Sequence, residues 1–437
     1  MLKSHNQSLD VCRRKAVSQP FFIHGKRMLS LRVSTTEFVA MMAMLVATVA
    51  MSIDAILPAL SLISEEFTPQ SPNQAQMVLS TFVIGMAAGT LFTGPLSDSF
   101  GRKSVIYFGT SLYIFTSILC VISHSFEVIL VARFLQGVGA SAPRVIAQAL
   151  VRDFYQGREM ARISSFIMIV FALVPAVAPL LGSFVIIMFE WRAIFVMFII
   201  FVVASTLWVG IRIDETVTIE RRIEFRLDQF LKATKEVLHN PMIQMSIITL
   251  VFAYSILFTG IFLIQPVFEQ VFHQAQSFPL WFALIALLAA SSSYLNAQLV
   301  RKVGMRKLIY IAFTAQLGLS FLMLLIYALG YFVGNFGFAL FVFWMFSIFF
   351  QAGLTMGNLT ALAMEPVGHI AGTAASLISA TATIGSVILA AIVGQLFDGT
   401  LLVMILGVGT FTLLGIVSAH QLRRYERGNI HPDTKSL

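Results

Sequence analysis

The amino-acid sequence predicts an all-α integral membrane protein with twelve transmembrane helices in two pseudo-symmetric six-helix bundles. Three observations support this prediction. First, the chain is 58% hydrophobic and 11% charged, whereas a soluble domain is about 45–50% apolar and about 25% charged. Second, its apolar residues form continuous runs of about 20, the length that crosses a bilayer. Third, its basic residues cluster at one end of these runs, as the positive-inside rule describes.

The apolar runs fall into two groups of six, separated by a charged stretch from Arg212 to Asn240. Their continuity favours helices, because the strands of a membrane barrel alternate apolar and polar residues over about ten positions. Only the short stretch from Phe189 to Trp191 separates the fifth run from the sixth. The predicted spans are Glu37–Leu60, Gln76–Leu96, Ser104–Ile122, Val128–Leu150, Ile163–Phe189 and Trp191–Ile211 in the first half, and Met242–Phe268, Leu280–Val300, Leu308–Leu329, Gly334–Thr360, Ala371–Leu396 and Leu401–Ala419 in the second.

Placing the N-terminus in the cytoplasm assigns all but three of the 29 Lys and Arg residues to the cytoplasmic side. The exceptions are Arg133, Arg144 and Arg192. This distribution predicts that both termini are cytoplasmic, and it explains the formal net charge of +8 without a nucleic-acid partner. We expect five segments, which are a cytoplasmic arm (1–36), an N-terminal six-helix bundle (37–211), a cytoplasmic linker (212–241), a C-terminal six-helix bundle (242–420) and a cytoplasmic tail (421–437).

The arm contains no apolar core long enough for a secretory signal, and we expect a partly disordered cytoplasmic segment. Cys12 lies in this arm and Cys120 in the third span, so the two cannot form an extracellular disulfide. The linker mixes charged residues with apolar ones such as Ile219 and Phe230. This mixture fits an amphipathic helix on the inner membrane surface and, equally, a solvated connection between the two bundles.

Internal repetition supports two related halves, a common plan in secondary transporters. The loop after the second span contains Gly101-Arg102-Lys103, and the loop after the eighth contains Gly304-Met305-Arg306-Lys307. Ile56-Leu57-Pro58, near the outer end of the first span, has a counterpart in Ile264-Gln265-Pro266 of the seventh. Both matches align the first six spans with the last six.

The loop between the second and third spans resembles the signature loop of the major facilitator superfamily, which it matches at its Gly, Asp, Gly and Arg/Lys positions. The resemblance implies a cytoplasmic gate in which the aspartate faces the N-terminus of the eleventh span. The alternative is a tight turn that fixes the topology, because glycine suits the turn and basic residues hold orientation in any membrane protein. The residues concerned are Gly94, Asp98, Gly101, Arg102 and Lys103.

Further motifs resemble the drug:proton antiporter branch of that superfamily, especially its bicyclomycin- and chloramphenicol-resistance type. In the fifth span Pro175, Pro179 and Gly182 match the antiporter motif of the branch loosely, since other small residues stand where the family prefers glycine. The two prolines by themselves indicate only a kinked, closely packed helix. The other matching stretches are Asp54 to Leu60, Arg133 to Ala140, Trp191 to Phe195 and Gly372 to Ser376, so the resemblance covers nearly all of the chain.

Asp54 is the one acidic residue deep in a predicted span, where an ionisable side chain is costly and usually functional. Counting from the outer span ends places Asp54 and Arg133 both about 9 Å below the outer surface, at 1.5 Å per residue. We therefore predict that Asp54 takes up and releases a proton while Arg133 holds or expels it. A purely structural ion pair between the two helices is the alternative.

Arg144 lies on nearly the same face of the fourth span as Arg133, within about 20° by helical geometry. It could contact a polar or anionic substrate in a central cavity, or it could reach the cytoplasmic interface with its long side chain. Gln136 and Gln265 are polar residues within spans, and with Arg144 they form the candidate substrate-binding set.

The sequence has no zinc-enzyme His/Glu spacing, phosphate loop or serine nucleophile motif. We therefore expect no enzymatic activity, metal or bound cofactor. The predicted function is a monomeric transporter in a bacterial inner membrane that exports small amphipathic compounds and is driven by the proton gradient. The alternatives are a proton symporter that imports a sugar or other metabolite, and a narrow exporter of such a compound.

Overall fold

The computed structural model describes residues 22–23, 26–27, 33–222 and 226–430 of the chain. Within them, 11 helical stretches are long and apolar enough to cross a membrane. The longest, Gly334–Gln395, covers 62 residues and contains two helices, α13 (Gly334–Met364) and α14 (Ala371–Gln395), joined by the 3₁₀ turn η5 (Glu365–Ile370). The protein is therefore a multi-pass membrane protein of twelve spans, as the sequence predicts.

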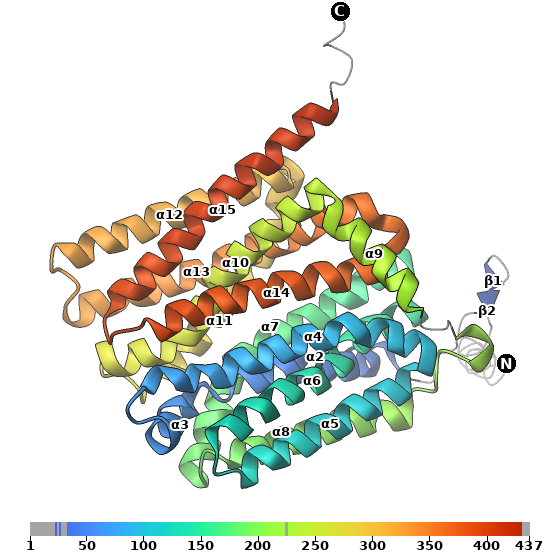
Figure 1. Ribbon diagram of the computed structural model, residues 1–437, viewed down its shortest axis with the longest axis horizontal. Coiled ribbons are helices and arrows are strands. Elements are labelled where there is room, and N and C mark those ends of the chain that lie inside the picture. The colour runs from blue at the N-terminus through green and yellow to red at the C-terminus, as the bar shows by residue number, and fades with distance from the viewer. Residues whose placement is uncertain (1–21, 24–25, 28–32, 223–225, 431–437) are drawn as a thin grey trace, which may run out of the picture.

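The N-terminal half lies in the lower part of Figure 1, and its first span is broken. The helix α2 (Thr35–Asp54) ends where the prediction continued to Leu60, and the chain goes on through the short helices η1 (Leu57–Ala59) and α3 (Leu60–Phe67). The remaining elements of this half are η2 (Pro72–Gln76), α4 (Met77–Phe100), α5 (Arg102–Ile122), α6 (Phe126–Phe154), α7 (Gly157–Met188) and α8 (Ala193–Arg212).

The C-terminal half lies in the upper part of Figure 1 and contains six long helices of its own. Its last helix continues beyond the predicted end of the span at Ala419. Its elements are α10 (Pro241–Pro266), the π-helical turn η4 (Val267–Val271), α11 (Phe278–Val303), α12 (Met305–Ala328), α13, η5, α14 and α15 (Leu401–Ile430). Outside the two halves lie η3 (Ile219–Arg221), α9 (Leu227–His239) and a small antiparallel pair of strands, β1 (Phe22–Ile23) and β2 (Lys26–Arg27).

Two glycines in equivalent loops confirm the relation between the halves. Gly101 joins α4 to α5 with φ 96° and ψ 154°, and Gly304 joins α11 to α12 with φ 82° and ψ 153°. This region of backbone space is essentially open to glycine alone. The same turn, made by the same residue type, therefore follows the second span of each half.

Glycines also set the closest contact within the N-terminal half. A Cβ added to Gly85 on α4 would lie 1.9 Å from the Phe134 carbonyl oxygen, and one added to Gly137 on α6 would lie 2.0 Å from that of Phe82. Such distances are impossible for real side chains, so α4 and α6 touch through their backbones. Small residues commonly allow this approach in membrane helices.

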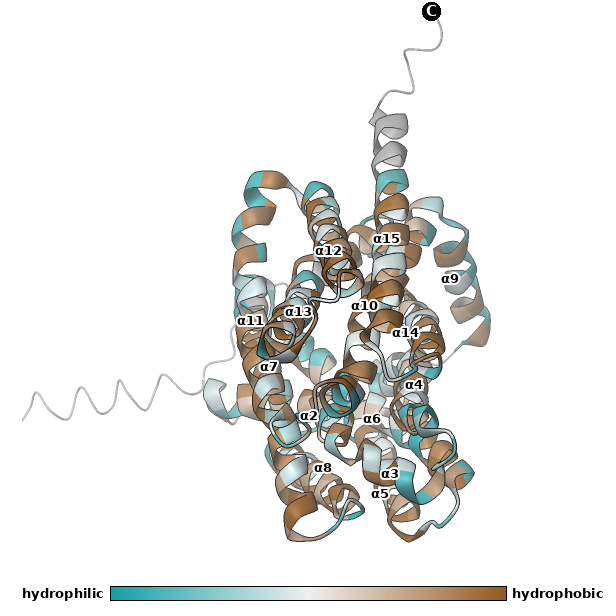
Figure 2. Cartoon of the chain, turned by 90° about the vertical axis from the view of Figure 1, so that its left-hand side faces the viewer, coloured by the Kyte–Doolittle hydropathy of each residue, from teal (hydrophilic) through white to brown (hydrophobic). Residues whose placement is uncertain are grey.

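The outer surface of the bundle is apolar. Exposed side chains such as Phe108 (73%), Ile200 (65%) and Phe321 (66%) suit helices whose solvent is lipid. Figure 2, which looks down the long helices, shows brown, hydrophobic residues on most of them and a mixture of teal and brown on α9. The exposed apolar side chains therefore agree with a lipid environment around the bundle.

The two halves pack against each other through α4 with α14 and through α7 with α11. The ends of the bundle differ, as Figure 1 shows: α3 lies at one end and α9 at the other. We call these the α3 end and the α9 end. All predicted loop residues between the second and third spans lie at the α9 end, and the break in the first span lies towards the α3 end.

The linker between the halves contains the helix α9, which packs on protein. Ala233 and Val237 are buried, the ring of Phe230 stacks on Phe92 of α4 at 5.8 Å, and α9 also contacts α10 and α14. Its opposite side exposes Leu231 to 57%. The helix thus touches both halves, so it is not a free solvated connection. The predicted N-terminal arm lies mostly outside the described residues.

Candidate functional site

Asp54 is the last residue of α2 and lies where the first span breaks. Proline lacks a backbone N–H, and its ring collides with the carbonyl group four residues earlier. Pro58 is four residues beyond Asp54, so it cannot donate the hydrogen bond to the Asp54 carbonyl that would continue α2 as a regular helix. The break at this proline places Asp54 at a helix terminus inside the membrane.

The Asp54 side chain is 5% exposed. Among the residues that the structure describes, none forms a hydrogen bond or an ion pair with its carboxyl group. An ionised carboxylate is costly at this depth unless a cation or a proton neutralises it. Asp54 is therefore a buried acid without a counter-ion among the described residues.

Arg133 lies beside the same helix terminus but does not form an ion pair with Asp54. Its side chain is completely buried, and it donates to the Ser52 carbonyl at 2.9 Å, to the Val78 carbonyl at 3.0 Å and to Gln136 Oε1 at 2.6 Å. The carbonyl groups at a helix C-terminus carry partial negative charge. Arg133 thus binds the last turn of α2 and connects it to α4 and α6.

A buried polar network surrounds Arg133. Ser52 Oγ and the Tyr113 hydroxyl share a hydrogen bond of 2.5 Å, and Gln136 Nε2 donates to Ser117 Oγ at 2.5 Å. The Arg133 guanidinium lies 4.3 Å from the centre of the Phe82 ring, where a cation–π interaction is favourable. Gln136 is itself fully buried, and its amide binds Arg133 and Ser117, so it is not available to a substrate in the way that the sequence predicted.

The proline and glycine motif of the fifth predicted span lies in α7 and contacts the chain at the break in the first span. A Cβ added to Gly182 of α7 would lie 2.0 Å from the carbonyl oxygen of Ala55, the residue that follows Asp54. Pro179 and Pro175 lie within α7, about one turn and about two turns before Gly182. The backbone of α7 therefore touches the chain immediately after Asp54, and only glycine at position 182 permits this contact.

Arg144 lies further along α6, and its described contacts are weak. One guanidinium nitrogen donates to the sulfur of Met86 at 3.2 Å, and the group is close enough to Tyr254 of α10 for an electrostatic interaction. Tyr254 begins a row of rings on α10 that continues through Phe258 at 6.2 Å and Phe262 at 5.8 Å. Arg144 thus faces the other half of the molecule without a carboxylate partner among the described residues.

The loop at the α9 end is a network within the N-terminal half. Arg102 donates to Asp98 at 2.5 Å and to Asp153 at 3.1 Å. Glu215, which follows α8, accepts from the backbone N–H groups of Arg102 and Lys103, each at 2.9 Å. Glu215 therefore supplies the acceptor that the first turn of α5 needs.

Two features of this loop differ from what the family resemblance implies. Within the described part of the chain, Asp98 makes no hydrogen bond or ion pair with α14, although a Cβ added to Gly94 would lie 3.9 Å from Ser376 of α14. The roles of Asp153 and Glu215 were not predicted. Asp153 follows Arg152 at the end of the fourth span, so its place in the sequence could have indicated a partner for a basic residue. Nothing in the sequence near Glu215 indicates its partner.

Gln265 lies at the α3 end, in a group of hydrogen bonds that joins the two halves. Its Nε2 donates to Ser61 Oγ at 2.8 Å and to Glu269 Oε2 at 2.7 Å, and Ser61 also donates to Glu269. Nearby, Asn73 donates to the Phe397 carbonyl at 2.6 Å and accepts from Gln395 Nε2 at 2.8 Å. The sequence did not indicate Glu269, because the predicted seventh span ends at Phe268.

Two related six-helix halves that pack along membrane-spanning helices, with a buried acid inside the first of them, are the plan of a secondary transporter. Residues 41–390 match the sequence profile of the Major Facilitator Superfamily. The chain belongs to this family, which is a family of transporters and not of enzymes.

The chain is similar to bacterial proteins named for drug resistance. It is 28% identical over 400 residues to a bicyclomycin resistance protein homolog of Haemophilus influenzae, covering 89% of this chain and 96% of the relative. It is 36% identical over 125 residues to the multidrug resistance protein MdtL of Escherichia coli O157:H7, covering 29% of this chain and 32% of the relative. These matches agree with the predicted resemblance.

Solved structures share the fold at low sequence identity. A peptide transporter crystallised with sulfate gives a TM-score of 0.71 at 12% identity, covering 95% of this chain and 98% of that chain. A D-xylose–proton symporter gives a TM-score of 0.68 at 13% identity, covering 89% of this chain and 96% of that chain. Both likenesses establish the fold and nothing about the substrate.

Proposed function

We propose that this chain is a proton-coupled antiporter that exports small amphipathic compounds across a bacterial inner membrane. The observation that carries the proposal is the buried, unpartnered carboxyl of Asp54 at the break of the first span. A carrier that exchanges a proton for a substrate needs one group that can be charged or neutral inside the membrane. The relatives named for bicyclomycin and multidrug resistance support export.

The proposed orientation places the α9 end in the cytoplasm. The loops that join α4 to α5, α6 to α7 and α11 to α12 are flanked by basic residues and lie at this end, whereas Arg192 pairs with Glu66 of α3 and so lies at the α3 end. The positive-inside rule then makes the α3 end the outer side and puts both termini in the cytoplasm. In this orientation the hydrogen bonds between Ser61 and Gln265 and between Asn73 and Gln395 close the outer side.

Alternating access then requires that the outer contacts open and that contacts at the α9 end close. Asp54 lies beside Ala55, which touches α7 at Gly182, and two residues after Ser52, which Arg133 binds. A proton on Asp54 removes one charge from this junction of α2, α6 and α7. We propose that this change of charge biases the equilibrium between the two orientations, since a ligand shifts an equilibrium only through such differential interactions.

Arg144 is the proposed substrate contact. Its guanidinium faces α10 with only the Met86 sulfur as a described hydrogen-bond acceptor, and a cation inside the membrane is otherwise paired. The row of rings that starts at Tyr254 offers an apolar surface on the facing helix. A compound with an aromatic body and an acceptor group would satisfy both features.

The test is uptake of a panel of antibiotics into inverted vesicles, whose interior corresponds to the outer side of the cell. Acidifying the interior should drive accumulation of an exported compound, and a protonophore should abolish it. Vesicles without the protein are the control. Accumulation in right-side-out vesicles with an acidic exterior would instead identify a proton symporter, the function of the D-xylose transporter that shares this fold.

A further inference from the structure

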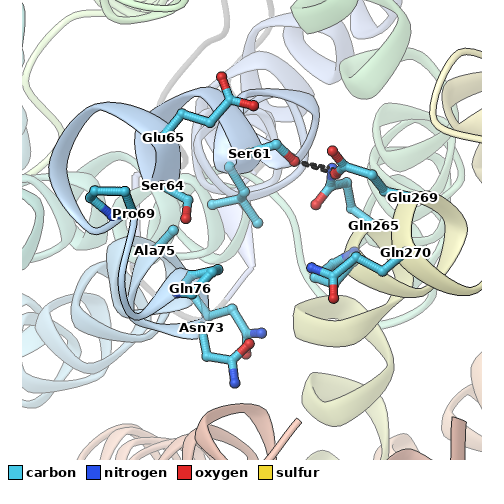
Figure 3. A pocket seen from close by; sticks show the side chains of 13 residues that line it. Ser61, Ser64, Glu65, Pro69, Asn73, Ala75, Gln76, Gln265, Glu269 and Gln270 are labelled. Atoms are coloured by element: carbon cyan, nitrogen blue, oxygen red, sulfur yellow. Dashed lines mark hydrogen bonds between the residues drawn. The ribbon is translucent and has the colours of Figure 1, made fainter. Parts of the chain in front are cut away.

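A polar pocket of about 240 Å³ lies at the α3 end between the two halves. Leu60 to Gln76 of α3, η2 and the chain between them form one side, and Gln265 to Gln270 of α10 and η4 form the other. Figure 3 shows Ser61 and Glu269 meeting across the pocket, with Gln76 and Asn73 on the side of the N-terminal half. The pocket is complete only when the outer ends of both halves are together.

The lining of this pocket carries negative charge and no basic residue. Glu65 and Glu269 are its two acids, and the remaining lining residues are neutral. Ser61 and Gln265 both donate to Oε2 of Glu269, which leaves Oε1 with unused capacity because a carboxylate accepts about four hydrogen bonds. No Lys, Arg or His of the described residues forms an ion pair with Glu269. A half-buried carboxylate is destabilised when no cation offsets its negative charge.

Gln76 provides a second, independent indication of a ligand. Its side chain is 3% exposed and lines the pocket, yet neither its Nε2 nor its Oε1 has a hydrogen-bond partner. The amide lies against the backbone of α14, since a Cβ added to Gly394 would be 2.1 Å from Oε1. A buried amide without partners is costly, and a ligand or a water can supply the missing hydrogen bonds.

The π-helical turn η4 explains how Glu269 reaches this position. Such turns are rare and occur frequently at functional sites. Here the turn Val267–Val271 follows Pro266 directly, and it carries Glu269 and Gln270 towards α3. The sequence alone would place Glu269 in a loop outside the membrane.

We propose that this pocket binds a small organic ammonium ion from the outer solution and that the bound ion holds the outer side closed. The ammonium group would lie on Glu269 Oε1, and the amides of Gln76 and Gln270 would contact the rest of the ion. A volume of about 240 Å³ corresponds to several waters at about 30 Å³ each, so an ion with a short carbon chain fits. A metal ion fits less well, because no three His, Cys, Asp or Glu side chains of the described residues gather here.

This proposal rests on the proposed function for its orientation and for alternating access, but not for proton coupling. Because the pocket includes residues of both halves, an ion bound there stabilises the closed outer side by its whole binding free energy. Opening the outer side separates Ser61 from Glu269 and destroys the site. The bound ion should therefore slow export without being exported.

The first experiment measures binding of 1,4-diaminobutane to the purified full-length protein in lipid nanodiscs. Its neutral counterpart 1,4-butanediol has the same length and is the ligand control. We expect binding of the diamine, no binding of the diol, and about 10-fold to 100-fold weaker diamine binding in Glu269→Gln, because a hydrogen bond to a charged group is lost. Glu190→Gln, an exposed acid that does not line the pocket, should bind like the parent.

The same pair of variants tests the consequence for transport. Diaminobutane loaded into inverted vesicles should slow export by the parent and by Glu190→Gln, and should leave export by Glu269→Gln unaffected. Equal binding by the Glu269→Gln protein, binding of the diol, or accumulation of the diamine as a substrate would each overturn the proposal. Asp54→Asn should still bind the diamine, so a failure of the proposed proton coupling is distinguished from a failure of this site.

Discussion

The buried guanidinium of Arg133 joins three helices beside the break in the first span. Its three described hydrogen bonds reach Ser52 of α2, Val78 of α4 and Gln136 of α6. Arginine suits this place because its planar fork presents donors in several directions, whereas a lysine ammonium is a single point charge. Arg133 therefore fixes the position of the helix end that carries Asp54, and it acts on the proposed proton site through geometry.

Arg133→Lys should lower the stability of the protein by about 2–4 kcal/mol, because at least one buried charge-assisted bond and the backbone acceptors that it served are left without partners. Thermal unfolding of the purified protein measures this change. Arg162→Lys is the matched control, since Arg162 is exposed and should unfold at nearly the parent temperature. An unchanged unfolding temperature in Arg133→Lys would contradict the role given to this guanidinium.

Gly182→Ala should disrupt the contact between α7 and the break. The added Cβ would lie 2.0 Å from the Ala55 carbonyl oxygen, so α7 must shift and the transport rate should fall at least tenfold. Gly357→Ala is the control, because nothing lies within 4 Å of a Cβ at that position of α13, and alanine is the better helix former. The transport rates of both variants are compared with that of the parent at equal expression. A parent-like rate in Gly182→Ala would contradict the proposal that α7 couples Asp54 to transport.

At the scale of the helices, two elements do more than cross the membrane or connect spans. The helix α9 packs on both halves through Ala233, Val237 and Phe230, and the turn η4 carries Glu269 into the α3-end pocket. Each lies outside the twelve predicted spans or at the edge of one. The linker and the span ends therefore add contacts between the two halves to those that α4 makes with α14 and α7 makes with α11.

Val237→Ala should loosen α9. Val237 is completely buried, and removal of two buried methyl groups costs about 1–3 kcal/mol. Proteolysis at the linker should become faster, because cleavage follows the population of the locally opened form. Leu231→Ala, at a position that is 57% exposed, should be cleaved at the parent rate. Equal cleavage of both variants would mean that α9 is not held by its buried face.

For the whole molecule, the sequence was sufficient to predict the fold because lipid imposes a simple rule on it. Every span must be a long apolar helix, so the runs of apolar residues identify the helices directly. The turn at Gly101 was also predictable, because its φ of 96° requires glycine. Pro58 removes the hydrogen bond that would continue α2 past Asp54, but a proline alone does not predict a break, since α7 continues through Pro175 and Pro179.

The contacts of the candidate site were less predictable, because they join residues far apart in the chain. The equal depth of Arg133 and Asp54 in the membrane suggested that their side chains pair. Depth does not determine the direction in which a side chain points, and the Arg133 guanidinium binds the Ser52 carbonyl instead. Glu215 reaches the start of α5 from the loop after α8, and Glu269 reaches Ser61 from the other half. No local pattern indicates such partners, since both glutamates have ordinary neighbours in the sequence.

The measurement that tests the central claim most directly compares Asp54→Asn with the parent in inverted vesicles, using a compound that the parent exports. Asparagine keeps the size of the side chain but cannot carry a proton. The variant should lose accumulation driven by an acidic interior while it still exchanges labelled for unlabelled compound in the absence of a pH gradient. Full gradient-driven accumulation by Asp54→Asn would show that Asp54 does not carry the coupled proton.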